Sequence, residues 1–185
     1  MSQGHPDVRR FQRLPRVTDP ARLAALDATG LVDAPAPSFD KLTRLAAAAL
    51  KAPIALMSLV GADRQTYVSR VGTRSTGSDL SRSFCKYVVE GGEALIVDDA
   101  RTHPLVRGSP AVEDGTVGAY AGFPVTTPEG HVLGSFCVID RTAREWSEDE
   151  LQTLRDLAAC AISEVELHLR RRQPASPPPP PLASG

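Results

Sequence analysis

The stretch that decides the fold is residues 120–140, Tyr-Ala-Gly-Phe-Pro-Val-Thr-Thr-Pro-Glu-Gly-His-Val-Leu-Gly-Ser-Phe-Cys-Val-Ile-Asp. Two apolar runs flank a short polar segment, in which Pro128 presets φ for a turn and Gly130 can adopt the positive φ that closes it. The pattern predicts a β-hairpin. Its second arm, residues 132–139, has apolar residues at both odd and even positions, which is typical of a central strand covered on both faces. Because small and slightly polar residues interrupt this arm midway, we expect it to line a pocket.

Composition limits the classes of partner. The chain has 185 residues, enough for one domain of about 150 residues plus tails. Its formal charge of -1 and its pI near 6.4 show no excess of positive charge that would attract nucleic acid or an anionic membrane, so neither is expected as a partner. No apolar run reaches the roughly 18 residues of a transmembrane helix. The three cysteines, Cys85, Cys137 and Cys160, are odd in number and widely spaced, which favours a reducing, cytoplasmic location.

Turn and capping signals divide the chain before the hairpin. Asp19 and Pro20 predict the start of a short helix that ends at Gly30. Ser83 similarly predicts a cap for a short helix that Gly91 and Gly92 stop. The expected elements, in chain order, are helices over 20–29 and 39–51, strands over 54–60 and 65–71, a mobile connection over 72–81, a short helix over 84–90, a strand over 94–97, a long loop with one helical turn over 100–116, and a strand over 117–123.

A long helix closes the domain. Ser147 and Glu150 form a Ser-x-x-Glu capping box, and Trp146 and Leu151 occupy the two positions of a hydrophobic staple. The helix is expected to run to about Arg172. We therefore assign residues 19–172 to one domain, residues 1–18 to a flexible N-terminal segment, and residues 173–185, which contain five consecutive prolines, to a disordered tail.

The element order predicts an α+β fold with an antiparallel sheet. At this level the chain resembles the GAF sensor family of bacterial signalling proteins. The matching pieces are residues 53–60 and 63–65, Ser83-Phe84-Cys85, residues 97–101, residues 120–125, residues 130–140 and the closing helix. The resemblance implies a central antiparallel sheet of five to six strands, with terminal helices on one face. It places a ligand pocket on the other face, roofed by the short helix and the long loop.

The resemblance also implies a function: a noncatalytic sensor that binds a small molecule and signals through its terminal helices. The output would pass to a separate signalling kinase, phosphatase or cyclase. It leaves the ligand and any cofactor unidentified. The Asn-Lys-Phe-Asp-Glu signature of cyclic-nucleotide-binding GAF domains is missing, and Cys85 is followed by Lys86 rather than by the His of bilin-attaching ones.

The expected ligand site combines the roof helix, the strand before the long loop and the hairpin. Its residues are Phe84, Cys85, Tyr87, Asp98, Tyr120, Ser135 and Cys137. No catalytic residue is assigned, because Asp98 and Asp99 are better explained as turn formers than as an acid and base pair. No metal site is assigned either, since the sequence has no Cys-x-x-Cys or His-x-x-x-His pair.

Two alternatives stay open. The Ser-Phe-Cys tripeptides at 83–85 and 135–137 allow a thiol-based redox sensor, or an enzyme resembling free-methionine-sulfoxide reductases, that uses Cys85 and Cys137. The other alternative is a protein-interaction domain whose pocket is filled by its own side chains.

The closing helix also suggests an assembly. A helix from Ser147 to Arg172 is about 39 Å long, whereas a sheet of five or six strands is only about 24–29 Å wide, so the helix should overhang. We expect a parallel homodimer with Val165 and Leu169 near its axis. In the alternative arrangement, the N-terminal helix folds back and covers the overhang within one chain.

Overall fold

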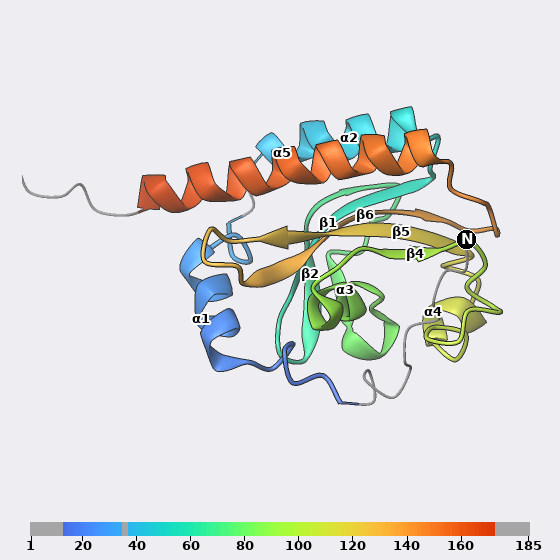
Figure 1. Ribbon diagram of the computed structural model, residues 1–185, viewed down its shortest axis with the longest axis horizontal. Helices are drawn as coiled ribbons and strands as arrows, with labels where there is room; N and C mark the ends of the chain where they lie inside the picture. The colour runs from blue at the N-terminus through green and yellow to red at the C-terminus, as the bar shows by residue number, and fades with distance from the viewer. Residues whose placement is uncertain (1–12, 35–36, 173–185) are drawn as a thin grey trace, which may run out of the picture.

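A six-stranded antiparallel sheet forms the middle layer of the computed structural model, which describes residues 13–34 and 37–172 (Figure 1). The strands follow the order β3-β2-β1-β6-β5-β4. Their bounds are β1 Ile54–Val60, β2 Arg64–Val71, β3 Gly77–Asp79, β4 Leu95–Val97, β5 Ala119–Thr126 and β6 Val132–Asp140. The predicted α+β class and sheet are confirmed.

The hairpin of β5 and β6 lies at the centre of this sheet. β6 pairs with β1 on one side and β5 on the other, so it is covered on both edges, and residues 133–139 are all buried. The predicted turn closes the hairpin: Gly130 adopts a φ of 88°, and its amide donates to the carbonyl of Thr127 at 2.9 Å. The sequence therefore located the central strand correctly.

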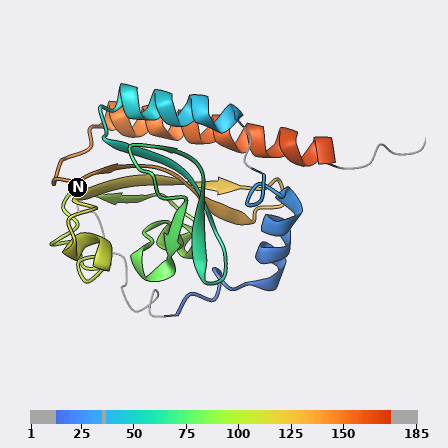
Figure 2. The ribbon, with the colours of Figure 1, turned by 180° about the vertical axis from the view of Figure 1, so that it is seen from behind.

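Two helices cover one face of the sheet, as Figures 1 and 2 show. They are α2 Ser38–Ala49 and α5 Glu148–Arg172. The capping box before α5 forms as predicted, because Glu150 accepts from the amide of Ser147 at 2.9 Å and Ser147 Oγ accepts from the amide of Glu150 at 3.2 Å. The core between these helices and the sheet includes Phe39, Leu50, Met57, Phe136, Leu154 and Val165.

The opposite face is covered by the predicted roof. It consists of the single-turn helix η2 Leu80–Arg82, helix α3 Cys85–Gly91 and the long loop, which contains α4 Pro110–Glu113. Ser83 caps α3, since its hydroxyl accepts from the amide of Lys86 at 3.1 Å. A second buried cluster fills this side and includes Leu56, Phe84, Val88, Val97, Tyr120 and Cys137.

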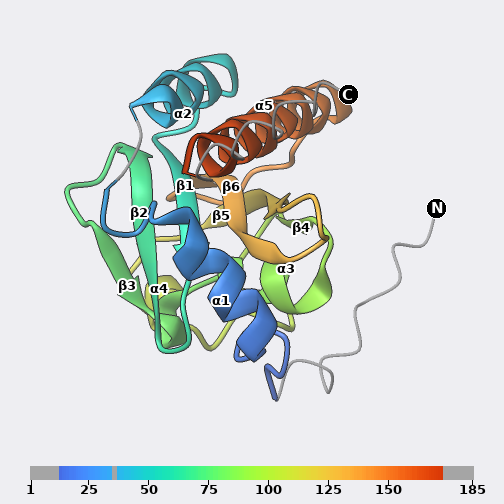
Figure 3. The same cartoon turned by 90° about the vertical axis from the view of Figure 1, so that its left-hand side faces the viewer.

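Helix α1, Pro20–Thr29, lies at one end of the sheet and not in the layer of α2 and α5 (Figure 3). The side chain of Asp19 caps it by accepting from the amide of Arg22 at 2.7 Å. Arg22 is itself buried and donates to the carbonyl oxygens of Val17 at 2.5 Å, Arg16 at 3.1 Å and Val132 at 3.4 Å. Burial lowers the pKa of Arg22 from its ordinary value. One buried guanidinium thus fastens α1 to both the preceding turn and the start of β6.

Two segments are more structured than their composition indicated. The connection over 72–81, which we expected to be mobile, contains the edge strand β3, paired with β2 from Gly77↔Thr66 to Asp79↔Arg64. Residues 14–18, assigned by sequence to the N-terminal segment, form a turn in which Val17 is fully buried. The chain therefore packs against the folded domain from before residue 19. The remainder of that segment, residues 1–12, and the tail after 172 lie outside the described residues.

The C-terminal part of α5 is covered within the chain. Val165 is fully buried in the same cluster as Leu26 and Leu31, and His168 Nε2 lies 2.9 Å from the carbonyl oxygen of Thr29. The structure therefore contains the alternative arrangement, in which the α1 region covers the overhang, and Val165 is not free to lie on a dimer axis. Leu167 is the large apolar side chain of α5 that stays exposed, at 40%. Within the described ranges, no helix has the length and apolarity to cross a bilayer.

Candidate functional site: a cavity under the roof helix

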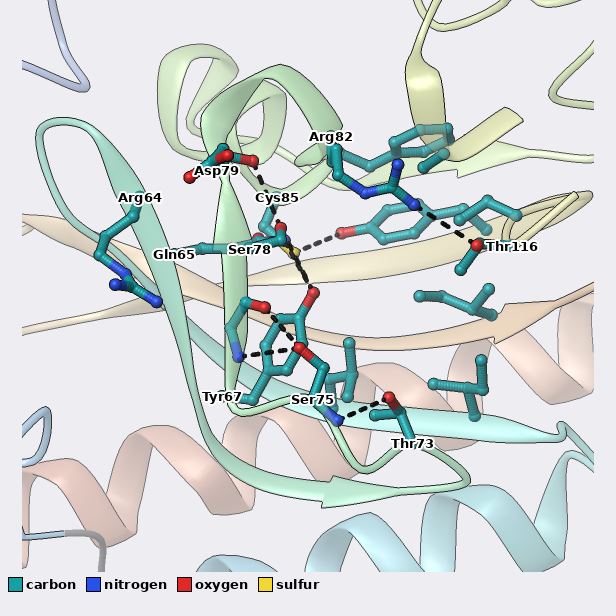
Figure 4. A pocket seen from close by; sticks show the side chains of 18 of the residues that line it. Arg64, Gln65, Tyr67, Thr73, Ser75, Ser78, Asp79, Arg82, Cys85 and Thr116 are labelled. Carbon is teal, nitrogen blue, oxygen red and sulfur yellow. Dashed lines mark hydrogen bonds between the residues drawn. The ribbon is translucent and has the colours of Figure 1, made fainter. Parts of the chain in front are cut away.

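A cavity of about 600 Å³ lies on the face of the sheet opposite α5 (Figure 4). Strands β1, β2, β3, β5 and β6 supply one side, and η2, α3 and the α4 loop supply the other. The lining residues are Ile54, Leu56, Arg64, Gln65, Tyr67, Thr73, Ser75, Gly77, Ser78, Asp79, Arg82, Phe84, Cys85, Ala111, Thr116, Val117, Tyr120, Ile139 and Arg141.

The base of the cavity is apolar and aromatic. Ile54, Leu56 and Ile139 reach it from neighbouring strands, because they occupy positions of β1 and β6 that face away from α5. The rings of Phe84 and Tyr120 stand next to them, with centroids 5.4 Å apart and planes inclined by 50°. This base can accommodate a flat or aliphatic part of a small molecule.

Gln65 organises the polar side of the cavity. Its Oε1 accepts from Ser83 Oγ at 2.7 Å and from Ser58 Oγ at 3.1 Å, while its Nε2 donates to Ser78 Oγ at 2.7 Å and Tyr67 Oη at 3.0 Å. Because Gln65 is 4% exposed and both ends of its amide form hydrogen bonds, its side chain is held in place. The network holds β2, β3 and the start of α3 in one position around the cavity.

The rim of the cavity carries more positive than negative charge. Its lining includes three arginines, Arg64, Arg82 and Arg141, and one carboxylate, Asp79. Figure 4 shows Arg64 and Arg82 at opposite sides. Arg82 is paired with Asp114 at 2.5 Å, whereas the guanidinium groups of Arg64 and Arg141 make no ion pair with any residue that the structure describes. Cationic side chains are therefore available to an anionic group.

Asp114 connects the long loop to η2, another part of the roof. Besides Arg82, it accepts from the hydroxyl of Thr116 at 2.6 Å and from the amide of Thr116 at 3.0 Å. Hydrogen bonds from Thr116 and Arg82 lower the pKa of Asp114 to about 2. The carboxylate is thus ionised under all physiological conditions and keeps Arg82 in place at the rim.

Beneath the base, four polar side chains are in contact. Tyr120 Oη lies 3.0 Å from Ser135 Oγ and donates to Cys85 Sγ at 3.5 Å, and the sulfur atoms of Cys85 and Cys137 are 3.9 Å apart. The phenol can lie along the strand only because residue 122 is glycine, where a Cβ would come within 2.2 Å of Tyr120 Oη. Gly122 therefore makes the position of this hydroxyl possible.

The two thiols have opposite pKa shifts. The hydrogen bond from Cys137, with help from Tyr120 and Ser58, lowers the pKa of Cys85 to about 7 against the effect of burial. The hydrogen bond with Cys85 and burial both raise the pKa of Cys137 well above its ordinary value. Burial likewise raises the pKa of Tyr120 well above its ordinary value. Of the three groups, Cys85 is therefore the one that loses its proton most readily.

The structure brings five of the seven predicted site residues together. Phe84, Cys85 and Tyr120 line the cavity, and Ser135 and Cys137 lie directly beneath them on the same face of the sheet. The other two are elsewhere. Tyr87 is half-buried on α3 beside the cavity-side core but is not part of the lining.

Asp98 has a different role from the one expected. Its carboxylate accepts from the amide of Trp146 at 3.3 Å, and its carbonyl accepts from the amide of Arg144 at 2.9 Å. It is exposed and does not line the cavity. Asp98 therefore fixes the connection from β6 to α5.

Sequence reasoning missed the polar lining from β2, β3 and the roof, namely Gln65, Tyr67, Ser78, Arg82 and Thr116. The alternation in residues 65–71 placed Gln65 and Tyr67 on one face, but nothing local distinguished a cavity from solvent on that side. Among the described residues, no group of three or more His, Cys, Asp or Glu side chains could hold a metal ion.

Comparison with known proteins gives the family and the fold. The model of the GAF domain matches residues 35–163. A cyclic di-GMP phosphodiesterase of Pseudomonas aeruginosa is 35% identical over 126 residues, which are 67% of this chain but only 22% of that protein. The chain thus spans about a fifth of the length of this curated relative.

Solved structures agree on the fold. The GAF domain of an Acinetobacter phosphoenolpyruvate-protein phosphotransferase superposes with a TM-score of 0.59 at 18% identity, covering 86% of this chain and all of that one. The free methionine-R-sulfoxide reductase of Neisseria meningitidis, in complex with its substrate, gives 0.59 at 16% identity, covering 89% of this chain and 92% of that one. At such identities the likeness concerns the fold alone.

Proposed function

Because the chain belongs to the GAF domain family, a family of sensor and regulatory modules, we propose that it is a noncatalytic sensor that binds a small molecule in the cavity under α3. The observation that carries this proposal is the cavity itself. Its volume of about 600 Å³ lies within the roughly 300–1,000 Å³ of small-molecule sites, and its apolar base with convergent polar groups is the usual composition of such sites.

The lining indicates the chemistry of the ligand. Phe84, Tyr120 and the aliphatic residues of β1 and β6 favour a flat or aliphatic body, and the rim arginines favour a carboxylate or phosphate group. The hydroxyls of Ser78 and Thr116 also belong to the lining and can form hydrogen bonds with a ligand. We therefore propose a small amphipathic anion.

The route from the cavity to the terminal helices starts at Glu90. This buried carboxylate of α3 accepts from the amides of Arg16 at 2.9 Å and Val17 at 3.3 Å. The turn that contains these residues leads directly into α1, whose last carbonyl contacts His168 of α5. A ligand that shifts α3 would thus displace α1 against α5, and that displacement is the proposed signal.

The receiver of the signal is proposed to be a separate signalling enzyme such as a kinase, phosphatase or cyclase. The phosphodiesterase relative supports this assignment, since it carries a matching segment within a much longer chain. We also propose a homodimer. Its contacts would use the exposed side of α5 around Leu167, because Val165 is covered within the chain.

Native mass spectrometry of freshly purified protein tests the proposal. We expect a co-purified small anion, or failing that, a thermal shift with members of a panel of small carboxylates and phosphate esters. Arg141→Gln should weaken binding about tenfold, which corresponds to about 1.4 kcal/mol, whereas Arg171→Gln at the end of α5 should not. A chain without bound mass that responds to no panel member would contradict the proposal.

Hydrogen exchange tests the route. Ligand should slow amide exchange in residues 14–18 and in α1 of the wild-type chain. In Glu90→Ala the same ligand should still bind, but the protection of α1 should be lost. Unchanged protection of α1 in that variant would show that the signal does not pass through Glu90.

A further inference from the structure

Two thiols form a buried pair at the base of the cavity. Cys85 stands at the start of α3 and Cys137 lies in the middle of β6, 52 positions later, yet their sulfur atoms are 3.9 Å apart. A disulfide needs about 2.05 Å between the sulfurs, so a small approach of α3 toward the sheet would bring them to bonding distance. The remaining cysteine, Cys160, is exposed on α5 and is separate from this pair.

Access to the two sulfurs is unequal. Cys85 belongs to the cavity lining although it is only 2% exposed, whereas Cys137 is fully buried and is not part of the lining. A small reagent that enters the cavity therefore meets Cys85 first. Cys137 can react only with a group that Cys85 already carries.

The surrounding groups make the two thiols chemically different. Cys85 Sγ accepts a hydrogen bond from Tyr120 and lies within hydrogen-bonding distance of Cys137 Sγ, and these contacts lower the pKa of Cys85 to about 7. Cys137 keeps its proton, because its pKa is raised well above the ordinary value. Since the thiolate is the nucleophilic form, Cys85 is the thiol that attacks.

We propose that Cys85 and Cys137 are a peroxide-oxidisable thiol pair, in which a hydroperoxide entering the cavity oxidises Cys85 and Cys137 then closes a disulfide with it. The Cys85 thiolate attacks the distal oxygen of the hydroperoxide, the O–O bond breaks, and the alkoxide leaves as alcohol (water, for hydrogen peroxide) after taking a proton. This step leaves sulfenic acid on Cys85. Cys137 then attacks that sulfur and expels hydroxide, which leaves as water with the proton of Cys137. Two electrons pass from the two sulfurs to the O–O bond.

Disulfide formation would change the cavity. It draws the first turn of α3 toward β6 and replaces the thiolate that accepts from the Tyr120 hydroxyl with a disulfide sulfur, so the base of the cavity is rearranged. The inference does not rest on the proposed ligand-sensing function. Oxidation can be measured with no ligand present. Failure of the oxidation proposal would therefore leave the ligand-sensing proposal unaffected, and the reverse also holds.

The test uses the full chain carrying Cys160→Ser, so that the buried pair is the only source of thiol. The protein is reduced, freed of reductant, treated with hydrogen peroxide or tert-butyl hydroperoxide, and alkylated in denaturant. We expect an intact mass lower by two hydrogens with no alkyl group added, and a peptide that links residues 85 and 137. The rate should be about tenfold higher at pH 8 than at pH 6, because a thiol with a pKa of about 7 ionises in that range.

Matched variants separate the two steps. In Cys137→Ser, Cys85 should gain one oxygen and react with dimedone, whereas Cys85→Ser should leave Cys137 reduced. Tyr120→Phe should move the pH profile of oxidation to higher pH, because the thiolate loses a donor. The proposal is overturned if both buried thiols remain alkylatable after excess hydroperoxide, or if the disulfides that form join separate chains.

Discussion

The side-chain oxygen of Gln65 accepts the hydroxyl hydrogen bond of Ser83 at 2.7 Å, which ties β2 to the residue that caps α3. The roof helix is thus positioned by a strand that lies three places from β5 in the sheet. Since the same oxygen also accepts from Ser58, this one amide joins the start of the roof to both β1 and β2.

Replacing that amide should destabilise the protein. Gln65→Leu fills a similar volume but leaves the hydroxyls of Ser58 and Ser83 without their acceptor, and we expect a loss of about 3 kcal/mol of unfolding free energy. Gln152→Leu, on the exposed side of α5, is the control and should change stability by less than about 0.5 kcal/mol. Equal effects in urea unfolding would show that the network contributes little.

Gly122 offers a test of packing beneath the cavity. Gly122→Ala should cost about 1–3 kcal/mol, because the new methyl group would overlap the Tyr120 phenol and Ser135 Oγ. Gly108→Ala is the matched control, since a Cβ there meets nothing within 4 Å. Thermal unfolding of the two variants decides the matter, and a neutral Gly122→Ala would mean that Tyr120 moves aside at no cost.

The Asp114 carboxylate should make the stability of the protein depend on pH in the acid range. Its pKa in the folded chain is lowered to about 2 from an ordinary 3.8, so its contribution to stability is fully present above about pH 4 and is lost as pH falls toward 2. The stability difference between wild type and Asp114→Asn should therefore be constant at neutral pH and vanish in acid. Chemical denaturation at pH 2 to 6 measures it. A difference that persisted at pH 2 would contradict the assignment.

Exposed leucines provide the test of assembly. If two copies meet along α5, Leu167→Glu should convert a dimer to a monomer in light scattering at micromolar concentration, whereas Leu45→Glu on α2 should not. Val165→Glu is unsuitable for this purpose, because a charge there would be buried and should unfold the chain. A wild-type monomer would remove the homodimer proposal.

The sequence predicted elements whose signals are local. The Ser147 and Glu150 box, the Gly130 turn and the apolar run of β6 each depend on residues within a few positions of one another. β3 escaped prediction because Gly77, Ser78 and Asp79 pair through their backbone and bury little apolar surface. Asp98 was misplaced because the local sequence shows a strand end but not which end of the sheet the cavity occupies.

The buried thiol pair could be predicted only in part. Sequence position suggested that Cys85 and Cys137 face one pocket, yet the separation of their sulfurs depends on how α3 rests on β6. The tilt of a helix over a sheet is set by many contacts from distant segments, including the hydrogen bonds of Gln65. Such a distance can be obtained only from the folded chain.

The way Arg22 is bound has a consequence for how this domain can vary. All three of its acceptors are main-chain oxygens, so the attachment of α1 does not depend on the side chains at positions 16, 17 and 132. The side chains at positions 16 and 132 can therefore change without loss of these hydrogen bonds, and position 17 can change within the limits of its buried packing, provided that position 22 keeps a planar donor with several N–H groups. In an alignment of homologues, the junction between the amino-terminal helix and the sheet would then be marked by one invariant arginine, with more variation at positions 16 and 132 than at the buried position 17.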